Sequence, residues 1–404
     1  MILDRLRSVG AFILLGMLSI ASPTSANADS PRFQVSGFAT LGAVTTDRDH
    51  IWFTRYGVNF PGDSDPDFSP DSLVGLQASL RLSAYNDLTV QAVVSEDGEE
   101  SYDPRFTLAF FRQTLAPGLS LRLGRLRAPF FMLSDSLRVN YAHPWVRPPV
   151  EVYGLNPFND LDGIDFLYHT RLGGFDAEIH PYYGSGGVPT PMGRARLKAM
   201  WGINLTLSRG DYSLYLGHGD GRFSLVRGDP PTKSVIAALD AEGLGSVAAD
   251  LSGTDGTTSF DSIGLQWDDG RWQVVSEFAR RRANRYVTSS SGWYVSVGRR
   301  FGVVTPYLVV ARQRLDDPIA AAAVSPSLDA SWKLFLTSRN NAQRSLSIGT
   351  RWDVSHFAAV KAELTHARLE RNSWGSYFVR DEARIAQIGG SAANTFSLSL
   401  DVTF

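Results

Sequence analysis

From Phe33 to the end of the chain, apolar and polar residues alternate with a period of two instead of following the helical period. The clearest case is the segment 395–404, in which every second residue is apolar: Phe396, Leu398, Leu400, Val402 and Phe404. The segments around 197–207, 263–267, 346–352 and 360–364 repeat this alternation. Because successive side chains of a strand point to opposite sides, the pattern predicts strands with one apolar and one polar face.

Applied to the whole chain, the alternation predicts roughly sixteen strands of about 9–13 residues, the length that a tilted strand needs to cross a membrane. The predicted strands are 33–45, 73–83, 87–96, 105–115, 119–128, 163–172, 174–184, 196–209, 211–225, 258–268, 271–283, 291–301, 303–315, 342–354, 357–370 and 394–404.

The connections between these strands alternate in length. Short connections rich in Gly, Asn and Asp, such as Gly173-Gly174 and Asp268-Asp269-Gly270, suit hairpin turns. The longer ones span 46–72, 129–162, 226–257, 316–341 and 371–393. Short turns on one side and long loops on the other are typical of an outer-membrane barrel, so the predicted fold is an all-β, transmembrane antiparallel β-barrel. A secreted soluble β-sandwich or β-helix is the alternative, but a sandwich would need its apolar faces to meet each other.

The N-terminal segment has the features of a secretory signal peptide. Basic Arg5 and Arg7 precede an apolar stretch over 9–21, and Ala26-Asn27-Ala28 provides small residues for cleavage before Asp29. The alternative, a membrane anchor, would need about 20 apolar residues. We therefore expect 1–28 to be cleaved, and 29–404 to form a single barrel domain in the outer membrane of a Gram-negative cell.

Composition narrows the functional classes. The chain has 404 residues and no Cys, which excludes disulfides, thiolate metal sites and cysteine nucleophiles. A net charge of −2 gives no overall attraction to nucleic acid. The seven His lack zinc spacing, and no nucleotide-binding or hydrolase motif occurs. We therefore expect no enzyme, no catalytic residue, no metal and no cofactor. Two Ala-rich loop stretches, 233–251 and 318–324, are expected to form short helices.

The segment 129–162 is the main candidate for a functional element. It is long and rich in aromatic residues, and Pro144, Pro148 and Pro149 stiffen it. We expect it to fold into the lumen and narrow the pore, because long loops of this kind tend to be functional. The alternative is an outward loop that packs on a neighbouring subunit. In the inward arrangement six residues would lie near the constriction: Asp135, Arg138, Tyr141, His143, Arg147 and Glu151.

Alternation also predicts which charged residues of the strands line the lumen. The predicted basic residues are Arg81, Arg171, Lys198, Arg351 and Lys361, and the acidic ones are Asp176, Glu178, Asp353 and Glu363. A further local excess of arginine comprises Arg280, Arg281, Arg282, Arg285, Arg299, Arg300, Arg312 and Arg314. Three interpretations of this excess stay open: an anion-attracting wall, contacts to lipopolysaccharide, or a solvated rim.

Two stretches resemble Gram-negative outer-membrane porins. The terminal alternation ending at Phe404 is similar to the signature read by the barrel-assembly machinery, and Leu121–Phe130 with the loop after it resembles sixteen-stranded porins. The nearest type is the phosphate-selective O and P class and its uncharacterised relatives. The resemblance implies a homotrimer with separate pores and passive diffusion. The chain departs from that class in having few lysines, so phosphate selectivity does not carry over.

The predicted function is thus a passive channel for small hydrophilic solutes or ions, with a preference for anions if the arginines line it. The alternative is a barrel with a non-transport role, either an adhesin or a membrane-embedded hydrolase. Expected partners are outer-membrane lipid, lipopolysaccharide, further copies of the chain and the assembly machinery.

Overall fold

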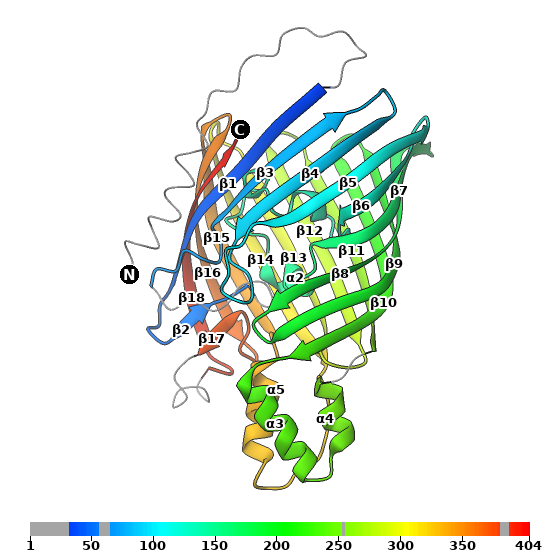
Figure 1. Ribbon diagram of the computed structural model, residues 1–404. Coiled ribbons are helices and arrows are strands. Elements are labelled where there is room, and N and C mark those ends of the chain that lie inside the picture. The colour runs from blue at the N-terminus through cyan, green and yellow to red at the C-terminus, as the bar shows by residue number, and fades with distance from the viewer. Residues whose placement is uncertain (1–31, 56–64, 253–254, 380–387) are drawn as a thin grey trace.

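The computed structural model describes residues 32–55, 65–252, 255–379 and 388–404. The predicted signal peptide lies outside the described residues. Sixteen antiparallel strands form a closed barrel, which confirms the predicted fold class (Figure 1). They are β1 (Arg32–Thr46), β3 (Leu73–Arg81), β4 (Asn86–Ser95), β5 (Arg105–Ala116), β6 (Leu119–Arg127), β7 (Asp160–Leu172), β8 (Phe175–Thr190), β9 (Gly193–Arg209), β10 (Tyr212–Arg227), β11 (Gly256–Asp268), β12 (Trp272–Ala283), β13 (Ser289–Arg299), β14 (Val304–Asp317), β15 (Gln343–Ser355), β16 (Ala358–Leu369) and β18 (Ala392–Thr403).

The first and last strands close the barrel. β1 pairs with β18, with Leu41 opposite Leu400, and on its other side with β3. The short strands β2 (Ile51–Phe53) and β17 (Tyr377–Val379) pair with each other in a separate sheet. Because both come from long connections, this small sheet ties two loops together at one end of the barrel.

Turns and loops lie at opposite ends (Figure 1). Tight turns such as Gly173-Gly174 use positive φ values of 56° and 85°, which glycine adopts without steric cost. At the loop end, the predicted helical stretch 233–251 forms α3 (Pro230–Ala241) and α4 (Gly245–Ser252). None of the helices in the described part of the chain combines the length and the apolar character needed to cross a membrane.

The helix predicted over 318–324 is wrong. The next helix is α5 (Asp329–Ser338), which begins further along the same connection. Its Trp332 and Phe335 pack in one apolar cluster with residues of α3 and α4. Alanine side chains bury little apolar surface, so packing of the aromatic segment decides where the helix forms.

Exposure identifies the two faces of the wall. On β18, Phe396, Leu398 and Leu400 are 44%, 45% and 44% exposed, whereas Ser397 and Ser399 are 1% and 4% exposed. The apolar face therefore points out of the barrel and the polar face points in, as the alternation predicts for a membrane barrel.

The predicted inward orientation of Lys198 is wrong. Lys198 is exposed, whereas its neighbour Leu197 is only 3% exposed and belongs to the cluster inside the barrel. Ala199 has a φ of +49°, and the pairing of β9 with both β8 and β10 shifts register near this point. A bulge inserts one residue and so exchanges the two faces of the strand beyond it.

The loop inside the barrel as the candidate functional site

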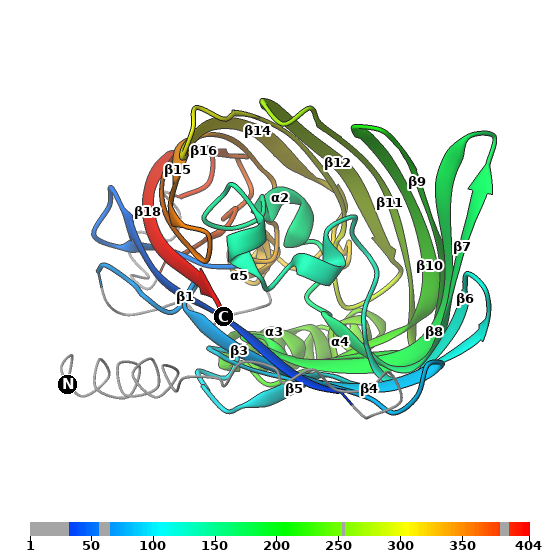
Figure 2. The same cartoon turned by 90° about the horizontal axis from the view of Figure 1, so that it is seen from above.

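The connection between β6 and β7, residues 128–159, lies inside the ring of strands (Figure 2). It contains two short 3-10 turns, η2 (Ser134–Ser136) and η3 (Asn140–Ala142), and the single-turn helix α2 (Val150–Tyr153). Each is too short to be stable alone, so its conformation depends on contacts with the wall.

The loop begins with hydrogen bonds to β9, β10 and β11. The backbone oxygen of Pro129 accepts from Asn204 Nδ2 and from the Tyr215 hydroxyl, both at 2.7 Å. The backbone oxygen of Phe130 accepts from the Ser262 hydroxyl at 2.9 Å. Inward-facing polar groups of the wall thus satisfy carbonyls that an irregular segment cannot pair by itself.

The middle of the loop is held from the β15–β16 side. Lys361 Nζ donates to the backbone oxygens of Asn140 at 2.6 Å and Trp145 at 2.8 Å, and it pairs with Asp401 at 2.8 Å. Arg351 Nη1 donates to the backbone oxygen of His143 at 3.0 Å. Lys361 is fully buried, so one desolvated ammonium group with a carboxylate partner fixes two turns of the loop.

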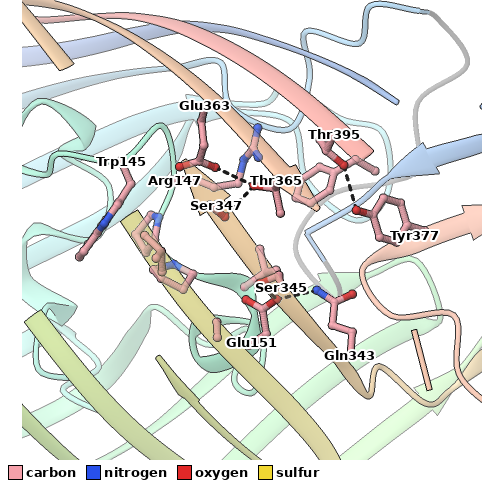
Figure 3. Close-up of a pocket in the computed structure, with 16 residues that line it drawn as sticks. Trp145, Arg147, Glu151, Gln343, Ser345, Ser347, Glu363, Thr365, Tyr377 and Thr395 are labelled. Carbon is pink, nitrogen blue, oxygen red and sulfur yellow. Dashed lines mark hydrogen bonds between the residues drawn. The ribbon is translucent and has the colours of Figure 1, made fainter. Parts of the chain in front are cut away.

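Side chains of the loop also reach the wall near β15 and β18 (Figure 3). Arg147 binds both carboxylate oxygens of Asp71 and donates to the Ser397 hydroxyl at 2.8 Å. Glu151 accepts from Gln343 Nε2 at 2.8 Å and from the Ser345 hydroxyl at 2.6 Å. Between these two anchors lies a pocket with both polar and apolar lining and about 460 Å³ of empty space, part of it open to solvent.

An apolar cluster stabilises the same arrangement. From the loop, Phe130, Phe131, Trp145 and Tyr153 pack with inward-facing wall residues such as Phe260. Fully burying one such side chain contributes about 1.5–3 kcal/mol, so the cluster outweighs any single hydrogen bond.

A glycine of the wall permits the close approach of α2. A Cβ added to Gly292 of β13 would lie 2.0 Å from the backbone oxygen of Glu151. No side chain fits at that distance, so the packing of α2 against β13 requires glycine at position 292.

The predicted site residues of the loop separate into two groups. His143, Arg147 and Glu151 are 5%, 6% and 2% exposed, and their hydrogen bonds to the wall anchor the loop. Arg147 and Glu151 also line the pocket between the two anchors, and the role of these three residues in lining the passage stays a prediction. Asp135 is exposed, and Arg138 and Tyr141 are half-buried.

Burial also determines the charge of His143. Burial, together with the neighbouring charges of Lys361 and Arg351, lowers the pKa of this imidazole to about 4, although the hydrogen bond with Ser136 acts in the opposite direction. His143 is therefore neutral at physiological pH.

The predicted lumen residues of the strands are also divided. Lys361 and Arg351 hold the loop, as described above, and the burial of Lys361 excludes it from lining a passage. Arg81 and Arg171 lie at the turn end and are exposed. Arg171 and its partner Asp176 are 85% and 74% exposed there, beside a hollow that also contacts Glu178.

Arg138, one of the predicted constriction residues, belongs to a group of arginines on the β4 side of the loop whose other members were not predicted from the sequence. Arg127 Nη2 donates to Gln91 Oε1 at 2.9 Å, and Arg138 Nη1 donates to the Ser95 hydroxyl at 3.4 Å. Arg105 is opposite Val93 in the register of β4 and β5. Three guanidinium groups thus gather around residues 91–95 of one strand. We call Arg105, Arg127 and Arg138 the arginine group.

The arginine group lies close to two acidic residues, Asp160 and Asp135, but its three guanidinium groups form no ion pair with either of them. Among the described residues, none of the three forms an ion pair, and Arg127 retains two buried nitrogens without a hydrogen-bond partner. Burial and the positive charges of Arg127, Arg55 and Arg105 lower the pKa of Arg138 to about 9, although Asp160 acts in the opposite direction, and Arg138 is protonated at neutral pH. The group is therefore a source of positive potential inside the barrel.

Most of the arginine excess noted on β12 and β14 does not face the lumen, so it does not add to this potential in the way that an arginine-lined inner wall would. Arg281 faces inward and donates to the backbone oxygen of Thr288 at 2.8 Å. Arg280 and Arg282 alternate with it and pair with Asp316 and Asp261 on the outer face. The interpretation of these two residues as an anion-attracting wall is wrong, because alternation turns them away from the lumen.

Comparisons with known proteins identify the fold. No family model matches the sequence, and no curated protein sequence matches it. Among solved structures, the anion-selective porin from Comamonas acidovorans is 12% identical, with a TM-score of 0.55, covering 93% of this chain and 100% of that one. OmpF of Salmonella typhi is 11% identical, with a TM-score of 0.54 and 94% and 99% of the two chains covered. OmpT of Vibrio cholerae, in a trimer form, is 11% identical, with a TM-score of 0.54 and 93% and 100% covered. The chain thus resembles sixteen-stranded outer-membrane porins in fold.

Proposed function

We propose that the protein is a passive diffusion channel for small hydrophilic solutes or ions, with a preference for anions. The observation that carries the proposal is the long loop held inside a closed barrel by hydrogen bonds to inward-facing residues. A loop in this position fills part of the cross-section of the lumen and leaves a narrower aqueous passage. A narrow passage selects solutes by their size and charge.

The arginine group supports the preference for anions. It lies on the β4 side of the loop, whereas the buried anchors of the loop lie toward β15 and β18. An excess of positive charge in a passage with low-dielectric walls raises the local concentration of anions, and the three arginines outnumber the neighbouring Asp135 and Asp160. The compared protein from Comamonas acidovorans is an anion-selective porin, which agrees with this choice.

The proposal includes location and partners. We place the barrel in the outer membrane of a Gram-negative cell, with residues 29–404 as one domain. The signal peptide 1–28 would direct export and would then be cleaved. Outer-membrane lipid, lipopolysaccharide included, would surround the wall, and the barrel-assembly machinery would read the strand that ends at Phe404. One compared structure is a trimer form, and we extend this assembly to a homotrimer here.

Conductance of the purified protein in a planar lipid bilayer tests the proposal. Wild-type protein should give discrete current steps. A variant that lacks 135–155 should give larger steps, because the segment occupying the lumen is gone. Absence of current from protein shown by circular dichroism to be folded would refute the channel. Equal steps from the two proteins would refute the constricting role of the loop.

A further inference from the structure

Three arginines stand in register on the outer face of β14, β15 and β16. Arg312 is opposite Arg344, and Arg344 is opposite Arg368, and all three are exposed. Neighbouring strands are about 4.8 Å apart, so the side chains of adjacent arginines leave the backbone within a few ångströms of one another. Like charges directly opposite each other destabilise a sheet unless an anion lies over them. We call these three residues the arginine row.

The arginine row marks the border between the apolar belt and the loop end. On the same outward face, two and four residues from Arg344, lie Leu346 and Ile348, which are 43% and 59% exposed. The residues between them, Ser345 and Ser347, are buried and face inward. On the other side of Arg344, β15 begins one residue away, at Gln343. The row therefore lies where a membrane barrel meets the headgroups of a leaflet.

The row has more positive charge than its surroundings balance. Within the described chain, Arg312 pairs with Glu370 at 3.3 Å, and neither Arg344 nor Arg368 has an acidic partner. By contrast, Arg280 and Arg282 on the same face pair with Asp316 and Asp261. The positive charge of the row thus occupies adjacent positions on three neighbouring strands.

We propose that the arginine row binds the phosphate groups of an anionic lipid headgroup in the leaflet that faces the loop end. Guanidinium groups bind phosphate oxygens in a bidentate manner, and arginine retains its charge in a partly desolvated position. Alkyl chains of the same lipid would lie along Leu346 and Ile348, so one molecule satisfies both the charged and the apolar part of this surface. The inference rests on the proposed membrane location but not on conduction.

Lipid binding by the full-length protein in zwitterionic detergent micelles tests this proposal. The probe is bisphosphorylated lipid A, titrated in the presence of EDTA so that divalent cations cannot bridge the phosphates. Native mass spectrometry counts the bound lipids and gives the dissociation constant. Dephosphorylated lipid A and inorganic phosphate are the comparison ligands.

The test variant is R312Q/R344Q/R368Q. Its matched control, R209Q/R271Q/R299Q, removes three exposed arginines at the turn end of the barrel. We expect the test variant to bind lipid A at least about tenfold more weakly, since it loses several charge-assisted hydrogen bonds, and the control to bind like the wild type. If the triple variant does not fold, R344Q alone deletes the centre of the row and should weaken binding severalfold.

Two results would overturn the proposal. One is equal binding of lipid A by the wild type and by a folded row variant. The other is that inorganic phosphate saturates the wild-type site at the same concentration as lipid A does, which would make the arginine row a site for free anions. Lipid binding is measured without any ion current. Absence of the lipid site can therefore be told apart from absence of channel activity.

Discussion

Replacing Arg127 and Arg138 by glutamine should shift the selectivity of the channel toward cations. Both guanidinium groups contact β4, at Gln91 and Ser95, and neither forms an ion pair with a described residue. Glutamine retains hydrogen-bonding capacity and removes the charge. The double variant R127Q/R138Q therefore isolates the electrostatic contribution of the arginine group.

The size of the shift follows from Coulomb's law. An ion passing about 7 Å from one unit charge in water gains or loses about 0.6 kcal/mol, and 0.1 M salt reduces this to about 0.3 kcal/mol. That energy raises anion occupancy roughly 1.7-fold and lowers cation occupancy by the same factor, so each arginine changes the anion-to-cation ratio about threefold. Removing both should change the ratio roughly eightfold, and more where the walls exclude water.

Reversal potentials in a tenfold gradient of potassium chloride measure this ratio. The matched control, R81Q/R171Q, removes two arginines at the exposed turn end, where one of them is paired with Asp176. It should change the ratio less than about twofold because water screens a wide mouth more strongly. If R127Q/R138Q shifts the reversal potential no further than the control, these arginines do not face the passage and the reasoning fails.

Three other changes test the structure directly. Because the chain has no Cys, K198C should react with a membrane-impermeant maleimide on intact cells, whereas L197C should resist it; the reverse pattern would refute the bulge in β9. K361M removes the cation that pairs with the buried carboxylate of Asp401, which costs about 3–5 kcal/mol. Calorimetry should therefore show a lower unfolding temperature, and current traces should become noisier. The lowered pKa of His143 means that the unfolded chain binds a proton which the folded chain excludes below about pH 6.5. Stability should fall as the pH decreases from 6.5 toward 4, by up to about 3 kcal/mol, and H143Q should lose that dependence.

The sequence is sufficient to predict the strands because the alternation that identifies each strand lies within that strand's own residues. Every predicted strand has a counterpart in the barrel, and the largest differences are extensions of β7, β8 and β9 at their loop ends. A membrane strand shows lipid on one side and polar groups on the other along its whole length, so the alternation is repeated many times. The face exchange at Ala199 escaped detection because a bulge adds one residue without leaving any compositional signal.

The partners of the loop could not be predicted in the same way. Arg147 binds Asp71, which is 76 residues away along the chain, and Glu151 binds Gln343, which is 192 residues away. Nothing local to either residue distinguishes a buried anchor from a charge that lines a passage. Aromatic content and proline correctly indicate that the segment needs burial, but the wall that buries it is defined only once the barrel is closed.

The distribution of arginine shows why composition alone is a weak guide to selectivity. Arg280, Arg281 and Arg282 are consecutive, yet the middle one supports the inner surface and its neighbours lie outside in ion pairs. The arginine group around β4 is small, and it lies where strands end and strict alternation stops assigning faces. Because potential falls off within about 10 Å in salt, only charges that reach the passage affect a permeating ion. It follows that a chain with a net charge of −2 can still favour anions, provided that arginines without an ion-pair partner lie at the narrowest point.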